Sequence, residues 1–147
     1  MKKVTARDFR VDYYEKEKDV WIVESHLVDE PHDISVIVEV DMAQMVINDA
    51  KIKFTRFPVE HCPAIEKKSG QLKGLKIDDQ FSRNAMKIFM GSEGCPNVMM
   101  LLSISLPGII YYYYPHKIKS GEMTEEQFDK IIRTELKDAC LAHAMLS

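Results

Sequence analysis

The sequence predicts a single α+β domain in which a three-stranded antiparallel sheet is covered on one face by about four helices. Two observations lead to this prediction. Residues 19–57 alternate apolar and polar side chains with a period of two, as half-buried strands do, and residues 58–147 repeat apolar side chains at helical spacing. Strands that are followed by helices, rather than alternating with them, are typical of an α+β fold.

Three strands are expected, in "DVWIVESHLVD", "DISVIVEVD" and "MVINDAKIKFTRF". The first places Trp21, Val23 and Leu27 on one face, and the other two alternate in the same way. The connections between them are short, whereas parallel strands need a crossover of about a dozen residues. The three strands are therefore expected to form an antiparallel meander.

Helices are expected in the second part of the chain. "CPAIEKKSGQL" predicts a short helix, and Asp78 is a suitable N-cap for "DQFSRNAMKIFM". "CPNVMMLLSISL" predicts a third helix, which Pro107 and Gly108 end or kink. The run "IIYYYY" has high β-propensity but no evident partner strand, so its structure stays open.

The last expected helix follows a capping box. Thr124 directly precedes the segment "EEQFDKIIRTELKDACLAHAML", and Gln127 within it has the spacing of such a box. Cys140 extends the apolar stripe of this segment through Ile132 and Leu136, and is therefore expected in the core.

Length and composition limit the number of domains, the class of partner and the location of the protein. The 147 residues fit one domain, divided into a partly ordered, charge-rich arm (1–18), strands (19–57) and helices (58–147). The net charge of −3 gives no basic surface, so nucleic acid is not expected as a partner. Three cysteines, an odd number, argue against a disulfide framework and favour a cytoplasmic location.

No membrane segment is expected either. The N-terminal lysines precede no apolar run, so the start does not have the pattern of a signal peptide. The most apolar window, residues 98–114, is interrupted by Pro107 and Gly108 and is shorter than the roughly 20 residues that a membrane helix needs. This window is interpreted as buried helix.

The candidate site begins with two cysteines that each precede a proline. Proline is favoured at the first helical position, so Cys62 and Cys95 are each expected at the N-cap of a helix. Free backbone N–H groups and the positive end of the helix dipole favour a thiolate there, and the thiolate is the form that attacks electrophiles and binds metals.

His32 and Asp33, in the turn between the first two expected strands, are the other candidates. Imidazole and thiolate together suit zinc or iron, and Asp33 would be a fourth ligand or the carboxylate that orients His32. The predicted metal ligands are therefore Cys62, Cys95, His32 and Asp33. Free cysteine also behaves as a small buried apolar residue, so two core cysteines are the alternative.

The segments "DVWIVESHLVD", "HDISVIVEVD", "INDAKIKFTRFP", "LKGLKI" and "GCPNVMMLL" together resemble a bacterial family of domains of unknown function, number 2889. The likeness covers roughly residues 19–103. That family has a signature histidine two residues after its late cysteine, where this chain has Asn97. No activity is implied by this resemblance.

Three strands followed by a cysteine that opens a helix also resemble, more distantly, the NifU- and SufE-like topology of iron–sulfur scaffold proteins. This resemblance implies cluster ligands at His32 and Asp33, at Cys62 and at Cys95. It implies a small accessory protein that binds zinc or an iron–sulfur cluster.

Two other functions stay open. One is a thiol enzyme in which Cys95 or Cys62 is the nucleophile and the other is the resolving thiol. The other is an interaction module without chemistry, which would form a homodimer or bind a protein partner through the helical face and Tyr111 to Tyr114. The substrate and the reaction, if there is one, are not indicated.

Overall fold

The computed structural model describes residues 1–146, and the chain divides into two compact units after Gly108. We call residues 1–108 the sheet unit and residues 109–146 the helical unit, and describe each by itself. That the two form one domain stays a prediction. The sheet unit contains, in order, β1 (Arg7–Glu17), β2 (Val20–Asp29), β3 (Asp33–Asp41), β4 (Val46–Arg56), η1 (Cys62–Leu72), α1 (Phe81–Phe89) and α2 (Pro96–Ser105).

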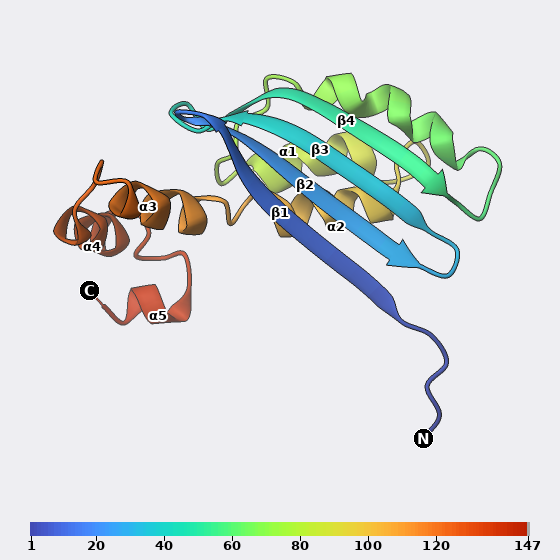
Figure 1. Cartoon of the computed structure of the whole chain (residues 1–147). Helices are drawn as coiled ribbons and strands as arrows, with labels where there is room; N and C mark the ends of the chain where they lie inside the picture. The colour runs from blue at the N-terminus through green and yellow to red at the C-terminus, as the bar shows by residue number, and fades with distance from the viewer. Residues whose placement is uncertain (147) are drawn as a thin grey trace. The chain divides into compact units, whose positions relative to one another are not determined.

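The sheet is antiparallel and is formed by neighbouring strands in chain order (Figure 1). The three predicted strands are confirmed as β2, β3 and β4. The predicted count of three is wrong, because the sheet of the described residues has four strands, in the order β1-β2-β3-β4. The additional strand, β1, lies in the segment that was expected to be a partly ordered arm.

The sequence does not predict β1, because β1 is an edge strand with charged residues on both faces. Its register with β2 nevertheless runs from Arg7, opposite Asp29, to Glu17, opposite Val20. The Tyr13 hydroxyl donates a hydrogen bond of 2.7 Å to the Ser105 carbonyl oxygen. This bond attaches the middle of β1 to the C-terminal end of α2.

One face of the sheet carries the core. Alternate residues of β2 and β3 are buried there against α1, α2 and η1, as their period-two pattern predicts. In β4 a register shift opposite Glu39 and Val40 changes the alternation after Ile47. The buried sheet residues are Trp21, Val23, Ser25, Leu27, Ile34, Val36, Val38, Val40, Ile47, Ile52 and Phe54. α1 contributes Phe81, Ala85 and Phe89, whose spacing places them on one side of the helix.

The helix boundaries differ slightly from those expected. Asp78 does not cap α1 directly: the N-cap residue is Gln80, and the Asp78 carboxylate accepts a hydrogen bond of 2.9 Å from the Gln80 backbone N–H. α2 begins at Pro96 with Cys95 at its N-cap, as predicted. η1 is a 3₁₀ helix that begins at Cys62 itself, so its N-cap is His61 and not the cysteine.

The helical unit contains α3 (Ile110–Lys119), α4 (Glu125–Thr134) and α5 (Leu141–Ala144). The open question of "IIYYYY" is thereby answered, since most of this run lies in α3. The predicted capping box is confirmed: the Thr124 hydroxyl accepts from the Gln127 N–H, and the Gln127 side chain accepts from the Thr124 N–H. The prediction of a core position for Cys140 is wrong, because the chain leaves α4 after Thr134 and exposes this cysteine.

The described residues therefore contain six helical segments rather than about four, and three of them belong to the sheet unit. One stretch, Pro96–Lys119, is long and apolar enough to cross a membrane by length and composition alone. Its α2 part buries Val98, Leu101 and Leu102 in the core of the sheet unit. Core helices of compact proteins have the same properties, and the absence of a membrane partner stays a prediction.

Candidate functional site

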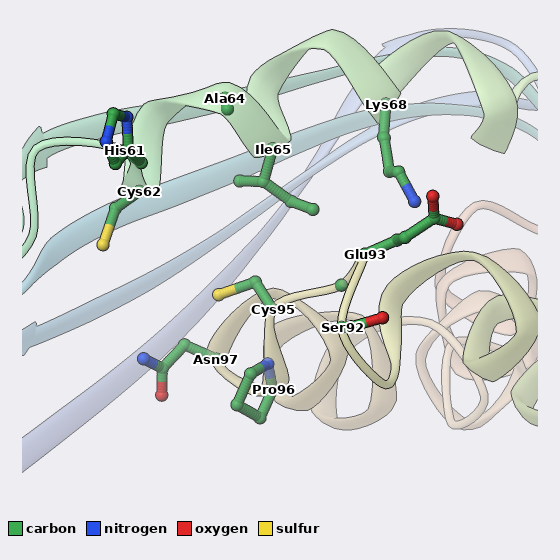
Figure 2. A pocket seen from close by; sticks show the side chains of 11 residues that line it. His61, Cys62, Ala64, Ile65, Lys68, Ser92, Glu93, Cys95, Pro96 and Asn97 are labelled. Carbon is green, nitrogen blue, oxygen red and sulfur yellow. The ribbon is translucent and has the colours of Figure 1, made fainter.

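A cavity of about 500 Å³ opens between the start of η1 and the start of α2. Both cysteines of the sheet unit line it, although they are separated by 33 positions in the chain. Figure 2 shows the Cys62 and Cys95 thiols pointing into the space between the two segments. Both cysteines are half-buried and neither forms a disulfide. The other lining residues are His61, Ala64, Ile65, Lys68, Ser92, Glu93, Gly94, Pro96 and Asn97.

Cys95 is placed by a tight return of the chain after α1. Gly91 adopts φ +81°, a left-handed conformation that glycine tolerates best, and turns the chain back. Gly94 then lies so close to the end of α1 that an added Cβ would be 2.0 Å from the Phe89 carbonyl oxygen. The same oxygen accepts a hydrogen bond of 2.8 Å from the Cys95 N–H. Only glycine at position 94 permits this approach.

Cys62 is placed by η1, which is held from two sides. The Glu66 carboxylate accepts a hydrogen bond of 2.8 Å from the Phe54 N–H of β4, and the Lys68 ammonium donates one of 3.1 Å to the Ile88 carbonyl of α1. The Cys62 N–H donates to the Val59 carbonyl at 2.9 Å. The two cysteines are therefore carried by segments that are both hydrogen-bonded to α1.

His32 lies beside the cavity as part of a closed polar ring, which we define as Arg7, Asp29, His32 and Asn97. Arg7 donates to Asp29 Oδ2 from Nε at 2.9 Å and to Asn97 Oδ1 from Nη2 at 2.5 Å. His32 Nδ1 lies 2.8 Å from Asp29 Oδ1, and Asn97 Nδ2 lies 3.2 Å from His32 Nε2. Asn97 thus lines the cavity and also contacts His32.

The ring defines the tautomer of His32. Arg7 can only donate, so Asn97 must present its oxygen to Arg7 and its NH₂ group to His32. His32 Nε2 is then the acceptor, and the imidazole carries its proton on Nδ1, from which it donates to Asp29. With this arrangement the guanidinium, the carboxylate, the imidazole and the Asn97 amide satisfy one another's hydrogen bonds.

Asp29 supplies the carboxylate of the ring. Partial burial would raise its pKa, but the hydrogen bonds that it accepts from Arg7 and from the His32 side chain and backbone hold the pKa below the usual value for aspartate. Its side chain is only 10% exposed. Asp29 therefore stays ionised at neutral pH and orients the imidazole.

Asp33 does not join the cysteines. Its carboxylate lies 2.6 Å from His26 Nε2, and His26 pairs with Arg10 and Ser35 across the neighbouring strands, on the face of the sheet opposite the core. Successive strand residues point to opposite faces, so Asp33 faces away from the buried Ile34. The carboxylate that orients His32 is Asp29 and not Asp33.

The predicted set of four ligands thus does not converge on one point. Cys62 and Cys95 share a cavity, His32 is adjacent through Asn97, and Asp33 contacts a different histidine. Among residues 1–146, no group of three or more His, Cys, Asp or Glu side chains is arranged to hold a metal ion. Zinc sites and iron–sulfur clusters need their ligands around a common centre, so a zinc or iron–sulfur cofactor stays a prediction.

The sequence did not indicate Arg7, Asp29 and Asn97 as site residues. Arg7 lies in β1, which has no clear period. Asp29 had a usable signal, because an aspartate three residues before a histidine in a Pro-containing turn is well placed to accept from its N–H. Asn97 stands where the resembled family has its signature histidine, and its contact with His32 depends on how α2 packs against the end of the sheet.

The comparisons with known proteins give one family. The model of a protein family described as "Protein of unknown function (DUF2889)" matches residues 5–106. No curated protein and no solved structure matches the chain significantly, so the predicted NifU- and SufE-like topology stays a prediction. The matched residues include β1, the polar ring and both cavity cysteines. Because the match covers more than half of its length, the chain belongs to the DUF2889 family.

Proposed function

We propose that the sheet unit is a dithiol protein that exchanges electrons with disulfides at Cys62 and Cys95. The observation that carries the proposal is the single cavity lined by both thiols. Both side chains are half-buried, so each thiol is accessible to a small reagent yet enclosed by protein. A cavity of about 500 Å³ is within the usual size range of small-molecule sites.

In the proposed reaction Cys95 attacks first, because it is the N-cap of a regular α-helix, where the first N–H groups have no partner within the helix. Its sulfur attacks one sulfur of an external disulfide. The external S–S bond breaks, a mixed disulfide forms, and the released thiolate takes up the proton that Cys95 lost. Cys62 then attacks the Cys95 sulfur of the mixed disulfide and expels the second external thiol, which takes up the proton from Cys62.

The products of this exchange are a Cys62–Cys95 disulfide and two reduced external thiols. Two electrons pass from the protein to the external disulfide, and no other reactant is needed. The reverse sequence would oxidise external dithiols. We favour this chemistry over metal binding because the reaction needs only two thiols in one cavity, whereas the metal site needs further ligands that the described residues do not bring together.

The test uses the full chain with Cys140→Ser, since Cys140 is exposed and would react independently. Reduced protein is mixed with oxidised glutathione and analysed by intact mass. We expect a species that is lighter by two hydrogen atoms and carries no glutathione. The matched Cys62→Ser and Cys95→Ser variants lack the second thiol and are expected to stop at one bound glutathione. A chain with both cysteines that accumulates two glutathiones and forms no internal disulfide contradicts the proposal.

A further inference from the structure

We propose that the turn formed by residues 29–32 is the common anchor that sets the separation of the two thiols, with Asn97 and Arg56 as its positioning residues. This inference rests on the proposed dithiol function and identifies the part of the fold that serves it. The turn itself is closed twice: the Asp29 N–H donates to the His32 carbonyl at 3.0 Å, and the His32 N–H donates to Asp29 Oδ1 at 2.7 Å.

The first connection runs from the turn to Cys95. Asn97 is held on one side by Arg7 and on the other by His32, and both of these residues are bound to Asp29. Asn97 is two residues after Cys95, in the first turn of α2. A side chain held at both its oxygen and its nitrogen cannot rotate without losing a hydrogen bond. The start of α2, and Cys95 with it, is thereby fixed relative to residues 29–32.

The second connection runs from the turn toward Cys62. Arg56, the last residue of β4, donates three hydrogen bonds to backbone carbonyls of the turn: Nε to Glu30 at 3.0 Å, and Nη2 to Asp29 at 2.6 Å and to His32 at 3.1 Å. The planar guanidinium reaches several acceptors at once, which a lysine cannot do. The segment that leads from β4 into η1, and so to Cys62, therefore starts from a fixed point on the same turn.

The two connections meet at residues 29–32, and they act in addition to the hydrogen bonds that both segments make to α1. Loss of either connection removes one restraint on the separation of the two thiols, while the opposite thiol keeps its connection to the turn. Reactions between two groups on one scaffold depend steeply on such placement, and a displacement of about 1 Å can lower the rate by about 100-fold. The predicted consequence concerns the joint reaction of the two thiols rather than the reactivity of either thiol alone.

The experiment measures this separation without redox chemistry. Dibromobimane alkylates one thiol and then the other, and its fluorescence reports the bridged product. Two rates are measured: the rate of bridging in the full chain carrying Cys140→Ser, and the rate of second alkylation between separate single-cysteine variants. The first rate divided by the second gives the effective concentration of one thiol at the other. We expect Asn97→Ala and Arg56→Gln each to lower this effective concentration by about tenfold.

Two comparisons show whether a lower bridging rate comes from lost positioning of the thiols or from a general loosening of the fold. Arg10→Gln removes an ion pair with Asp12 and does not contact the turn, so it is expected to leave the bridging rate unchanged. In the single-cysteine variants, Asn97→Ala is expected to leave the alkylation rate of Cys62 unchanged. A general loosening would raise it. Arg7→Lys, which loses the forked contact with Asp29 and Asn97, provides a second variant if Asn97→Ala does not fold.

Each result has a defined meaning. A bridging rate that is the same in Asn97→Ala, Arg56→Gln and the parent protein overturns the inference, as does a parent protein in which the thiols are not bridged. If bridging occurs and falls as expected while oxidised glutathione produces no internal disulfide, the positioning role holds and the dithiol function fails.

Discussion

The side-chain amide of Asn97 lies 3.2 Å from Nε2 of His32, although the two residues are 65 positions apart. This contact joins the first turn of α2 to the turn between β2 and β3. It also closes the polar ring and assigns the imidazole proton to Nδ1. Replacing Asn97 with another donor or acceptor therefore changes the hydrogen bonding of His32, Arg7 and Asp29 together.

Gly94→Ala is expected to destabilise the protein, because the new Cβ would lie 2.0 Å from the Phe89 carbonyl oxygen and the backbone must move to relieve the clash. We expect a loss of about 1–3 kcal/mol in the free energy of unfolding, measured by urea denaturation. Gly70→Ala is the matched control, since its Cβ would meet no atom within 4 Å. Equal effects of the two changes would contradict the close approach.

Truncation tests whether β1 belongs to the fold. Removal of residues 2–5, which are exposed and outside regular structure, is expected to leave the melting temperature nearly unchanged. Removal of residues 2–17 deletes the whole edge strand, the Tyr13–Ser105 hydrogen bond and the Arg7 member of the polar ring. We expect the longer truncation to lose cooperative unfolding in circular dichroism. A cooperative transition in both would show that β1 is dispensable.

The Asp29 carboxylate makes stability depend on acid pH. Its pKa is lower in the folded chain than in the unfolded chain, so its contribution is fully present above the unfolded value of about 3.9 and is lost as the pH falls through the folded value. Urea midpoints measured between pH 7 and pH 2 should therefore fall at the acid end. Asp29→Asn should lower the midpoint at pH 7 and flatten this dependence.

The control for that measurement is Asp8→Asn, since Asp8 is an exposed residue next to Arg7 on the same strand. It is expected to change the urea midpoint at pH 7 much less than Asp29→Asn does. A profile for Asp29→Asn that parallels the parent protein at every pH would show that the hydrogen bonds from Arg7 and His32 do not stabilise the folded chain.

Thr124→Ala tests the helical unit separately. The substitution removes the hydroxyl that accepts from the Gln127 N–H at 3.1 Å, and N-cap substitutions of this kind cost about 1 kcal/mol. Thr134→Ala is the matched change in the last turn of the same helix, where the hydroxyl only donates to the Lys130 carbonyl. Hydrogen exchange of the α4 amides should accelerate in the first variant and change little in the second.

The sheet was predictable wherever one face of a strand is buried. β2 and β3 alternate clearly because every second residue packs into the core, and β4 does so at Ile52 and Phe54, beyond its register shift. β1 repeats the pattern weakly, through Phe9, Val11 and Tyr13. None of these three is fully buried. A strand whose pairing is set mainly by backbone hydrogen bonds leaves little trace in the hydrophobic pattern.

The candidate site was predictable in part. The Cys-Pro pairs correctly marked two helix starts, and both cysteines line one cavity. The face of the sheet on which the Asp33 side chain lies could not be predicted from the sequence. The direction of a side chain at a strand end depends on the register, and a shift of one residue exchanges the two faces. The ring partners of His32 come from β1 and α2, so they depend on tertiary packing that no local pattern encodes.

The two edges of the sheet are protected from pairing with other chains in different ways. β4 is covered along its edge by η1, and Glu66 accepts from the Phe54 N–H that another strand would otherwise bind. β1 has no such cover in the sheet order, but seven of its eleven residues are charged. A strand from a second molecule could add to β1 only by desolvating those charges. The charged residues that obscure the strand pattern of β1 in the sequence therefore also protect the protein against edge-to-edge aggregation.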